Sequence, residues 1–106
     1  MGQAKTLGGT GVAYIRITRP QSLTGYVYDA ISIELDLGRD HPLGLIAHAA
    51  GEADGSWHIV EIWESEDFAQ RFDRERLVPA IEAVTGRPPP RNAPTVAFEL
   101  RGLVTP

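Results

Sequence analysis

The sequence predicts an α+β domain in which four β-strands and two helices follow one another in the order β-α-β-β-α-β. Three observations predict this class. Several short runs alternate apolar and polar residues and are rich in β-branched and aromatic side chains, as strands are. Two longer stretches repeat apolar residues every three or four positions, as amphipathic helices do. Two of the strand-like runs are joined by Asp54-Gly55, a dipeptide that favours a tight hairpin turn.

The first half of the chain predicts one strand and one helix. Apolar and polar side chains alternate over residues 12–18, which favours a pleated strand. Either Ser22 or Thr24 is suited to cap a helix over residues 25–35. The apolar stripe of this helix consists of Leu23, Val27, Ile31 and Leu35.

The second half predicts a hairpin, a helix and a final strand. The hairpin occupies residues 45–64. A second helix begins after Ser65, and because Pro79 lacks the backbone N–H, we expect this helix to kink or restart near residues 77–78. A proline-rich connection then leads to a last strand over residues 95–104. This order is typical of the ferredoxin-like arrangement, a four-stranded antiparallel sheet with both helices on one face.

The hairpin turn determines which side chains share a face of the sheet. A two-residue turn pairs His48 with Glu61 and Ile46 with Trp63, and a four-residue loop leaves both faces unchanged. A three-residue loop with a left-handed Gly55 would place His48 and Glu61 on opposite faces. We favour the first grouping, because it gathers the polar groups with Trp57 under the helices. The opposite face is then almost wholly apolar: Leu45, Ala47, Ala49, Val60 and Ile62, with His58.

The strands are apolar on both sides, whereas two helices can cover only one face of the sheet. An antiparallel sheet with one wet face would alternate cleanly between apolar and polar residues. We therefore expect the bare face to pack against the same face of a second chain in a homodimer. The alternative is a moderately apolar face that remains in contact with water.

The composition narrows the function classes. The net charge of -4, without a basic stripe, argues against binding to nucleic acid or to a membrane surface. The chain has no cysteine and no compact His and acid cluster, so we expect no metal and no cofactor. Residues 1–11 are glycine-rich and aperiodic, and we expect a flexible segment ahead of a single domain at residues 12–106. Because no long apolar run is present, a cytoplasmic protein is expected.

Three motifs resemble the dimeric α/β-barrel superfamily, and within it small bacterial proteins related to antibiotic-biosynthesis monooxygenases. The motifs are GLIAH at residues 44–48, WHIVEIWES at residues 57–65 and LVPA at residues 77–80. The resemblance implies a ferredoxin-like monomer whose sheet pairs with a second one to close a barrel. Members include cofactor-free oxygenases, haem-degrading enzymes and isomerases. The asparagine and the helix-borne histidine of the haem-degrading branch have no match here, so the resemblance does not extend to that activity.

The face under the helices is the candidate pocket. A carboxylate beside a histidine orients the imidazole and favours its protonated form, so His48 and Glu61 are the candidate catalytic residues, with His48 as the general base. Flat apolar walls for an aromatic or polyketide-like ligand would come from Trp63, Tyr28, Phe68 and Phe72. The prediction is a small-molecule pocket in each subunit of a cofactor-independent monooxygenase. The alternatives are a non-catalytic binding or structural module of this fold, or an isomerase or lyase that uses the same histidine. A lone histidine or tryptophan on an apolar strand is also common as a packed core residue.

Overall fold

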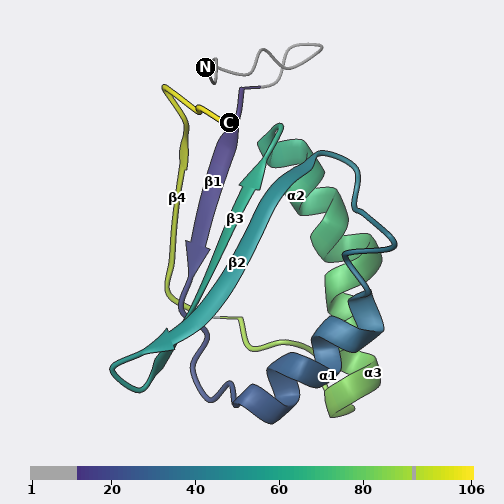
Figure 1. The fold of residues 1–106 in the computed structure, drawn as a ribbon. Helices are drawn as coiled ribbons and strands as arrows, with labels where there is room; N and C mark the ends of the chain where they lie inside the picture. The colour runs from purple at the N-terminus through teal and green to yellow at the C-terminus, as the bar shows by residue number, and fades with distance from the viewer. Residues whose placement is uncertain (1–11, 92) are drawn as a thin grey trace.

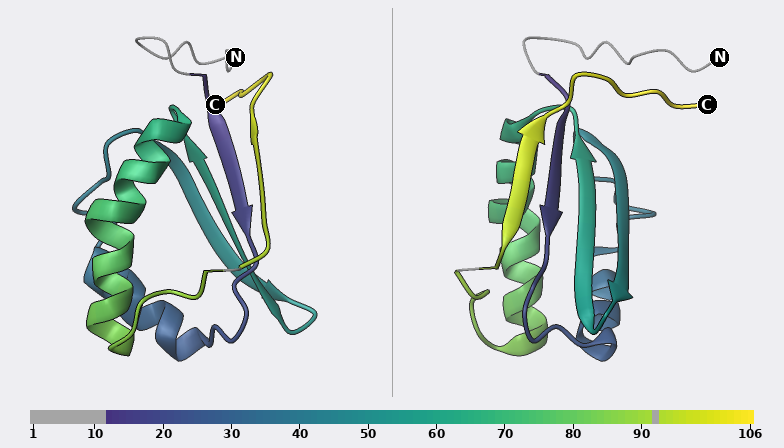
Figure 2. Two further views of the ribbon diagram at one scale, coloured as in Figure 1. Left: turned by 180° about the vertical axis from the view of Figure 1, so that it is seen from behind. Right: turned by 90° about the vertical axis from the view of Figure 1, so that its left-hand side faces the viewer.

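The computed structural model describes residues 12–91 and 93–106, and the predicted flexible segment 1–11 lies outside them. The described chain forms one four-stranded antiparallel sheet with the helices on one face (Figures 1 and 2). The strand order is β2-β3-β1-β4. The predicted ferredoxin-like α+β fold is therefore confirmed. The strands are β1 (Tyr14–Thr18), β2 (Leu45–Ala53), β3 (Ser56–Trp63) and β4 (Thr95–Glu99).

Helix α1 (Gly25–Leu35) has the predicted bounds. The Thr24 side chain caps it, because its Oγ1 accepts a hydrogen bond from the backbone N–H of Val27 at 3.2 Å. The helix ends at Asp36, which adopts a left-handed conformation with φ 48°.

The second helical segment is interrupted near the predicted place. Helix α2 (Glu66–Phe72) passes into a π-helical turn, η1 (Asp73–Leu77), and then into α3 (Val78–Thr85). Pro79 lies in the first turn of α3, where its missing N–H costs no helical hydrogen bond. In η1 the backbone N–H of Val78 reaches the carbonyl of Asp73, five residues back. Phe72, Asp73, Leu77 and Val78 all keep right-handed helical backbone angles, so α2, η1 and α3 run on as one helical segment.

The hairpin follows the two-residue turn, since Asp54 and Gly55 have φ of 53° and 76°. Ala53 pairs with Ser56 and His48 with Glu61, as predicted. The predicted pair Ile46–Trp63 is wrong: an irregularity between Leu45 and Ala47 places Leu45 opposite Trp63. One extra residue in β2 shifts the register, so Leu45 joins the buried face instead of the bare one.

Two strands are shorter than the sequence predicts. The first begins at Tyr14 rather than at residue 12, and the last ends at Glu99 rather than at residue 104. Tyr14 pairs with Glu99, and just beyond this pair Leu100 N donates to the carbonyl of Ala13 at 2.7 Å. After Leu100, the described chain forms only an isolated bridge at Val104.

The core lies between the helices and one end of the sheet. Trp63 is fully buried at its centre, and its ring lies 5.2 Å from that of Phe72. The other buried members are Leu35, Leu45, Ala69 and Ala80. None of the helices in the described ranges covers the opposite face of the sheet (Figure 2). None of these helices is long and apolar enough to cross a membrane.

Candidate active site beneath the helices

Three polar side chains form one row across the sheet, on the face that the helices cover. The register places Arg16 of β1 opposite Glu61 of β3, and Glu61 opposite His48 of β2. Because side chains alternate along a strand, all three point to the same side as Trp63. Charged residues are seldom buried unless they are paired, so such a row marks a candidate site.

Glu61 is the centre of the row and is only 6% exposed. Its Oε1 accepts hydrogen bonds from Arg16 Nε at 3.1 Å and Nη2 at 2.7 Å, and from Trp63 Nε1 at 3.4 Å. Burial acts to raise the pKa of the Glu61 carboxyl. The neighbouring His48 imidazole, the charge and hydrogen bonds of Arg16 and the Trp63 N–H outweigh burial and lower this pKa below its ordinary value. Glu61 is therefore ionised at neutral pH and suited to orient its neighbours rather than to exchange a proton.

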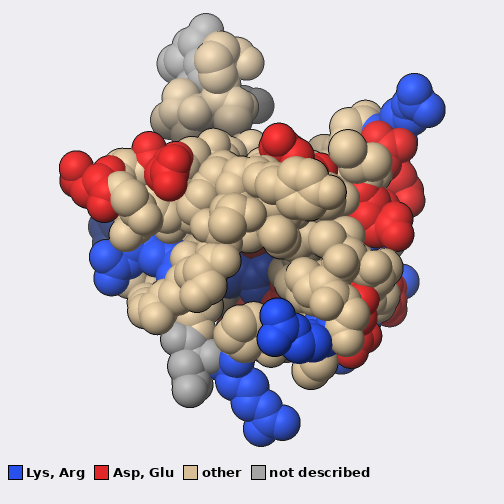
Figure 3. All heavy atoms as spheres, turned by 90° about the horizontal axis from the view of Figure 1, so that it is seen from below, with Lys and Arg blue, Asp and Glu red and all other residues tan. Residues whose placement is uncertain are grey.

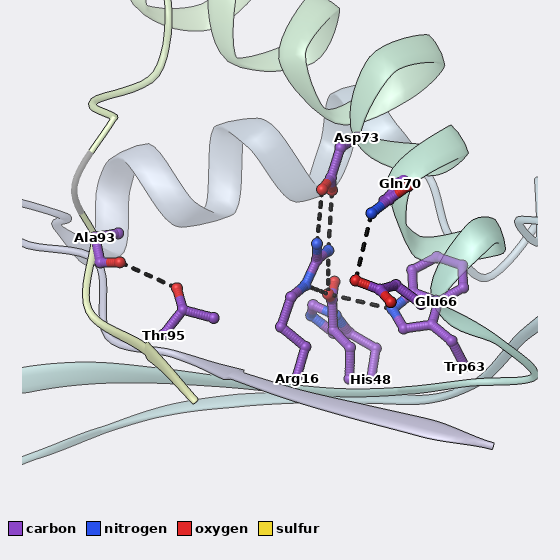
Figure 4. Close-up of polar contacts among 9 residues, drawn as sticks. Arg16, His48, Trp63, Glu66, Gln70, Asp73, Ala93 and Thr95 are labelled. Atoms are coloured by element: carbon purple, nitrogen blue, oxygen red, sulfur yellow. Dashed lines mark hydrogen bonds and ion pairs between the residues drawn. The ribbon is translucent and has the colours of Figure 1, made fainter. Parts of the chain in front are cut away.

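Arg16 joins the sheet to the helical layer. Its Nη1 donates to Asp73 Oδ2 at 2.6 Å and its Nη2 to Asp73 Oδ1 at 2.9 Å, a bidentate pair (Figure 4). Burial acts to lower the pKa of the Arg16 guanidinium. The hydrogen bonds and charges of Asp73 and Glu61 outweigh burial and raise this pKa above its ordinary value, so the group stays charged. The π-helical turn η1 begins with Asp73, and π-helical turns occur often at functional sites.

His48 lies between Glu61 and a tyrosine on α1. The hydroxyl of Tyr28 is 3.0 Å from His48 Nε2, and His48 Nδ1 is 3.6 Å from Glu61 Oε2. Nδ1 is buried and, at that distance, has no hydrogen-bond partner in the described chain. Because His48 Nδ1 faces the ionised Glu61 carboxylate, we assign the tautomer of His48 that carries its proton on Nδ1. In this tautomer Nε2 accepts a hydrogen bond from the Tyr28 hydroxyl. The three groups form a carboxylate–imidazole–hydroxyl series.

An aromatic pair borders this series. The rings of Tyr28 and Trp57 stack with centroids 4.9 Å apart, and Trp57 projects from β3 toward the start of α1. Gly25 at the start of α1 lies close to the indole, since a Cβ there would be 3.7 Å from Trp57 Cζ2, an ordinary van der Waals distance. The pair offers partly exposed ring surface next to His48.

The structure brings the predicted site residues together only in part. Tyr28 contacts His48, as the predicted faces require. Trp63 and Phe72 pack against each other in the core, and Phe68 packs at its edge, against Gly44. Trp63 is 0% exposed, so it has no surface open to a ligand in this conformation.

Solvent reaches the charged row from one end of the molecule. The view from below shows a hollow with basic and acidic atoms at its floor (Figure 3). The side chains of Arg16 and Asp73 keep 15% and 31% of their surface exposed, and that of His48 keeps 23%. A second depression of about 250 Å³ lies elsewhere, between α1 and α3, and is lined by Glu34, Leu35, Asp40, Arg76, Pro79 and Ala80.

Sequence reasoning missed Arg16, Asp73 and Trp57 as members of the site. Arg16 carried a signal, since a charged residue at an inward position of an apolar strand needs a buried partner. Asp73 carried a weaker signal: it lies one helical turn after the buried Ala69, on the inner side of the helix, but its partner Arg16 on the sheet could not be predicted from this spacing. Trp57 was assigned to the correct face, but its partner on α1 depends on how the helix packs.

No group of three or more histidine or acidic side chains in the described residues is placed to hold a metal ion. Arg16 occupies the centre of the acidic pair Glu61 and Asp73, where a cation would otherwise lie.

Comparison with known proteins places the fold. No protein-family model and no curated protein matches the sequence. A solved structure of a proposed antibiotic biosynthesis monooxygenase from Caulobacter crescentus is similar, with a TM-score of 0.61, 13% identity, and coverage of 85% of this chain and 90% of that one. SnoaB, a cofactor-independent oxygenase from Streptomyces nogalater, is similar with a TM-score of 0.55, 14% identity, and coverage of 90% and 97%.

The chain shares the ferredoxin-like α+β fold of these two proteins. A heme-degrading protein from Mycobacterium tuberculosis is also similar, with a TM-score of 0.52, 14% identity, and coverage of 92% of this chain and 100% of that one. At identities this low, the likeness establishes the fold alone, and the reaction has to be argued from the site.

Proposed function

We propose that this chain is a small-molecule-binding enzyme, a cofactor-independent monooxygenase that acts on an aromatic or polyketide-like substrate. The observation that carries the proposal is the series Glu61–His48–Tyr28, assembled from β3, β2 and α1. A histidine held between a carboxylate and a hydroxyl is an arrangement suited to proton transfer. The fold shared with SnoaB, described as a cofactor-independent oxygenase, supports the same class of reaction.

In the proposed reaction the substrate itself supplies the electrons. His48 removes a proton from an acidic C–H or O–H, either directly or through the Tyr28 hydroxyl. The resulting enolate or phenolate reacts with dioxygen, so that a CH₂ carbon is oxidised to a carbonyl and the second oxygen atom leaves as water. Tyr28 and Trp57 would offer ring surface to the substrate, while Trp63, Phe68 and Phe72 belong to the core at the other end of β3.

We further propose that the functional unit is a homodimer. The bare face of the sheet is apolar, and its large members include Val96 and Phe98, which are 60% and 49% exposed. A second copy laid against this face would bury these side chains and leave the site under the helices free.

A non-catalytic binding module is the second candidate. The observation that favours it is the dense packing of the site: Trp63 is fully buried, and Tyr28 already occupies His48 Nε2. An isomerase or lyase on the same scaffold would use His48 without consuming oxygen.

Oxygen uptake with a panel of anthrones and polycyclic phenols tests the proposal. The wild type is expected to consume oxygen with at least one of them, and His48→Ala to lose about 10²- to 10⁴-fold of the rate while keeping its circular dichroism spectrum. His41→Ala is the control, since His41 is an exposed loop residue whose Nε2 lies 2.8 Å from the Leu45 carbonyl and contacts no member of the series. Conversion without oxygen uptake would indicate an isomerase or lyase. Binding without conversion would indicate a binding module, and a His48→Ala variant with unchanged activity would remove His48 from the mechanism.

A further inference from the structure

The charged row beneath the helices carries one more negative charge than positive. Arg16 contributes one positive charge, and Glu61 and Asp73 contribute one negative charge each. No other residue forms an ion pair with Arg16 in the described chain. With a neutral imidazole, the formal charge of the cluster is therefore −1.

Arg16 has almost no capacity left for an anionic ligand. A guanidinium has five N–H donors, and four hydrogen bonds run from Arg16 to the two carboxylates. An incoming carboxylate or phosphate would have to displace Glu61 or Asp73 from bonds of 2.6 to 2.9 Å. It would also meet the surplus negative charge where solvent screening is weak.

A neutral acid meets the opposite situation. When it gives its proton to His48, the imidazolium forms beside Glu61 and the formal charge of the cluster changes from −1 to 0. The same cluster that repels an anion therefore favours the capture of a proton.

We propose that the pocket selects aromatic ligands by charge, accepting a neutral molecule with a weakly acidic O–H or C–H and rejecting its carboxylated or phosphorylated counterpart, and that Asp73 sets this selectivity. The inference rests on the proposed function, because it concerns the same pocket. Asp73 lies in η1, holds Arg16 in a bidentate pair and supplies the surplus charge. It acts on the ligand through the field of the cluster rather than by taking part in the reaction.

Binding of two matched probes by the full chain tests this inference. Near neutral pH, 2-naphthol is neutral and 2-naphthoate is ionised, while both present the same ring system. We expect calorimetry or ligand-observed NMR to show that the wild type binds naphthol at least about tenfold more tightly than naphthoate, the effect of one unit charge several ångströms away. Equal affinities, or tighter binding of naphthoate, would overturn the inference and leave the proposed pocket intact. If neither probe bound, or if naphthol did not, the proposed pocket would be overturned and the inference with it; binding of naphthol alone would support both.

The variant Asp73→Asn isolates the charge. Asparagine keeps the size and one acceptor for Arg16 but removes the surplus charge, so the preference for naphthol should fall to within about twofold. The matched control is Glu75→Gln, which removes the same charge two residues along the chain, from an exposed side chain paired with Arg71. The preference should survive in this control. An Asp73→Asn variant that folds and keeps the full preference would assign the selectivity to something other than Asp73. If the variant does not fold, the comparison of the two probes on the wild type still decides the inference.

Discussion

At the scale of single residues, Glu61 shows how a buried carboxylate remains charged. Burial works against ionisation of the carboxyl group. His48 of β2, Arg16 of β1 and Trp63 of β3 together reverse this effect. The same contacts that hold the charge also fix the direction of the carboxylate, with Oε1 toward Arg16 and Oε2 toward His48. Stability and the geometry of the candidate site therefore depend on one side chain.

Replacing Glu61 with glutamine should destabilise the protein in a pH-dependent way. At neutral pH we expect a loss of about 2–3 kcal/mol in the free energy of unfolding, because Arg16 loses a buried charged partner. The pKa of Glu61 is lower in the folded chain than its ordinary value of 4.5. Its stabilising contribution is therefore complete above pH 4.5 and is lost as the pH falls through the lower, folded-state pKa.

Urea denaturation of the wild type and Glu61→Gln at a series of pH values measures this contribution. The difference between the two should shrink below pH 4.5. Glu75→Gln, an exposed change of the same kind, should give a small and nearly constant difference. A Glu61→Gln difference that stayed constant down to low pH would contradict the account of its charge.

At the scale of elements, the junction between the loop, β2 and α2 depends on one glycine. Gly44 has φ +81°, and a Cβ at this position would lie 2.3 Å from Phe68 Cγ. The backbone carbonyl of Gly44 also accepts a hydrogen bond from Glu64 N at 2.7 Å. The close approach sits next to the irregularity in β2 that turns Leu45 into the core.

Gly44→Ala should therefore cost about 2–4 kcal/mol in the free energy of unfolding, because the substitution adds a clash to an unfavourable backbone conformation. Gly51→Ala in β2 is the matched control, since a Cβ there meets nothing within 4 Å. Chemical denaturation of both variants measures the contrast. If Gly44→Ala proved as stable as Gly51→Ala, the packing of Phe68 on Gly44 would not be a constraint on the fold.

The same junction marks the limit of what the sequence predicts. Local signals act within a few residues of the chain. Asp54-Gly55 predicted the hairpin turn and with it the pairing of His48 with Glu61. The capping residue Thr24 predicted the start of α1. The extra residue in β2 lies beside the close contact between Gly44 and Phe68, two residues that are separated in the chain by strands β2 and β3. The alternation of the strand could not reveal it, so Leu45 was assigned to the wrong face.

At the scale of the whole molecule, the two layers explain why the site was only partly predictable. The row Arg16–Glu61–His48 follows from strand register, whereas Tyr28 and Asp73 arrive from the helical layer. Strand register follows from sequence pattern and turn type, but the packing of helices on the sheet follows from side-chain shape across the core. The pairs that cross between the two layers, Arg16 with Asp73 and Trp57 with Tyr28, were therefore missed, although His48, Glu61 and Tyr28 were each predicted.

The bare face of the sheet gives the last prediction, which concerns assembly. Phe98 lies on the edge strand β4, where it pairs with Ile15 of β1, and is 49% exposed on the bare face, so a charge at this position would be tolerated in a single chain. In a homodimer the same charge would be buried without a partner, and Phe98→Glu should weaken association at least about tenfold.

Sedimentation velocity or light scattering at micromolar concentration measures this effect. The wild type is expected to sediment as a dimer and Phe98→Glu as a monomer with an unchanged circular dichroism spectrum. Ile33→Glu is the control, because Ile33 is 79% exposed on α1, away from the sheet, and its substitution should leave the dimer intact. A wild type that is monomeric under these conditions would mean that the apolar face stays in contact with water, and the proposed pocket beneath the helices would then have to belong to a single chain.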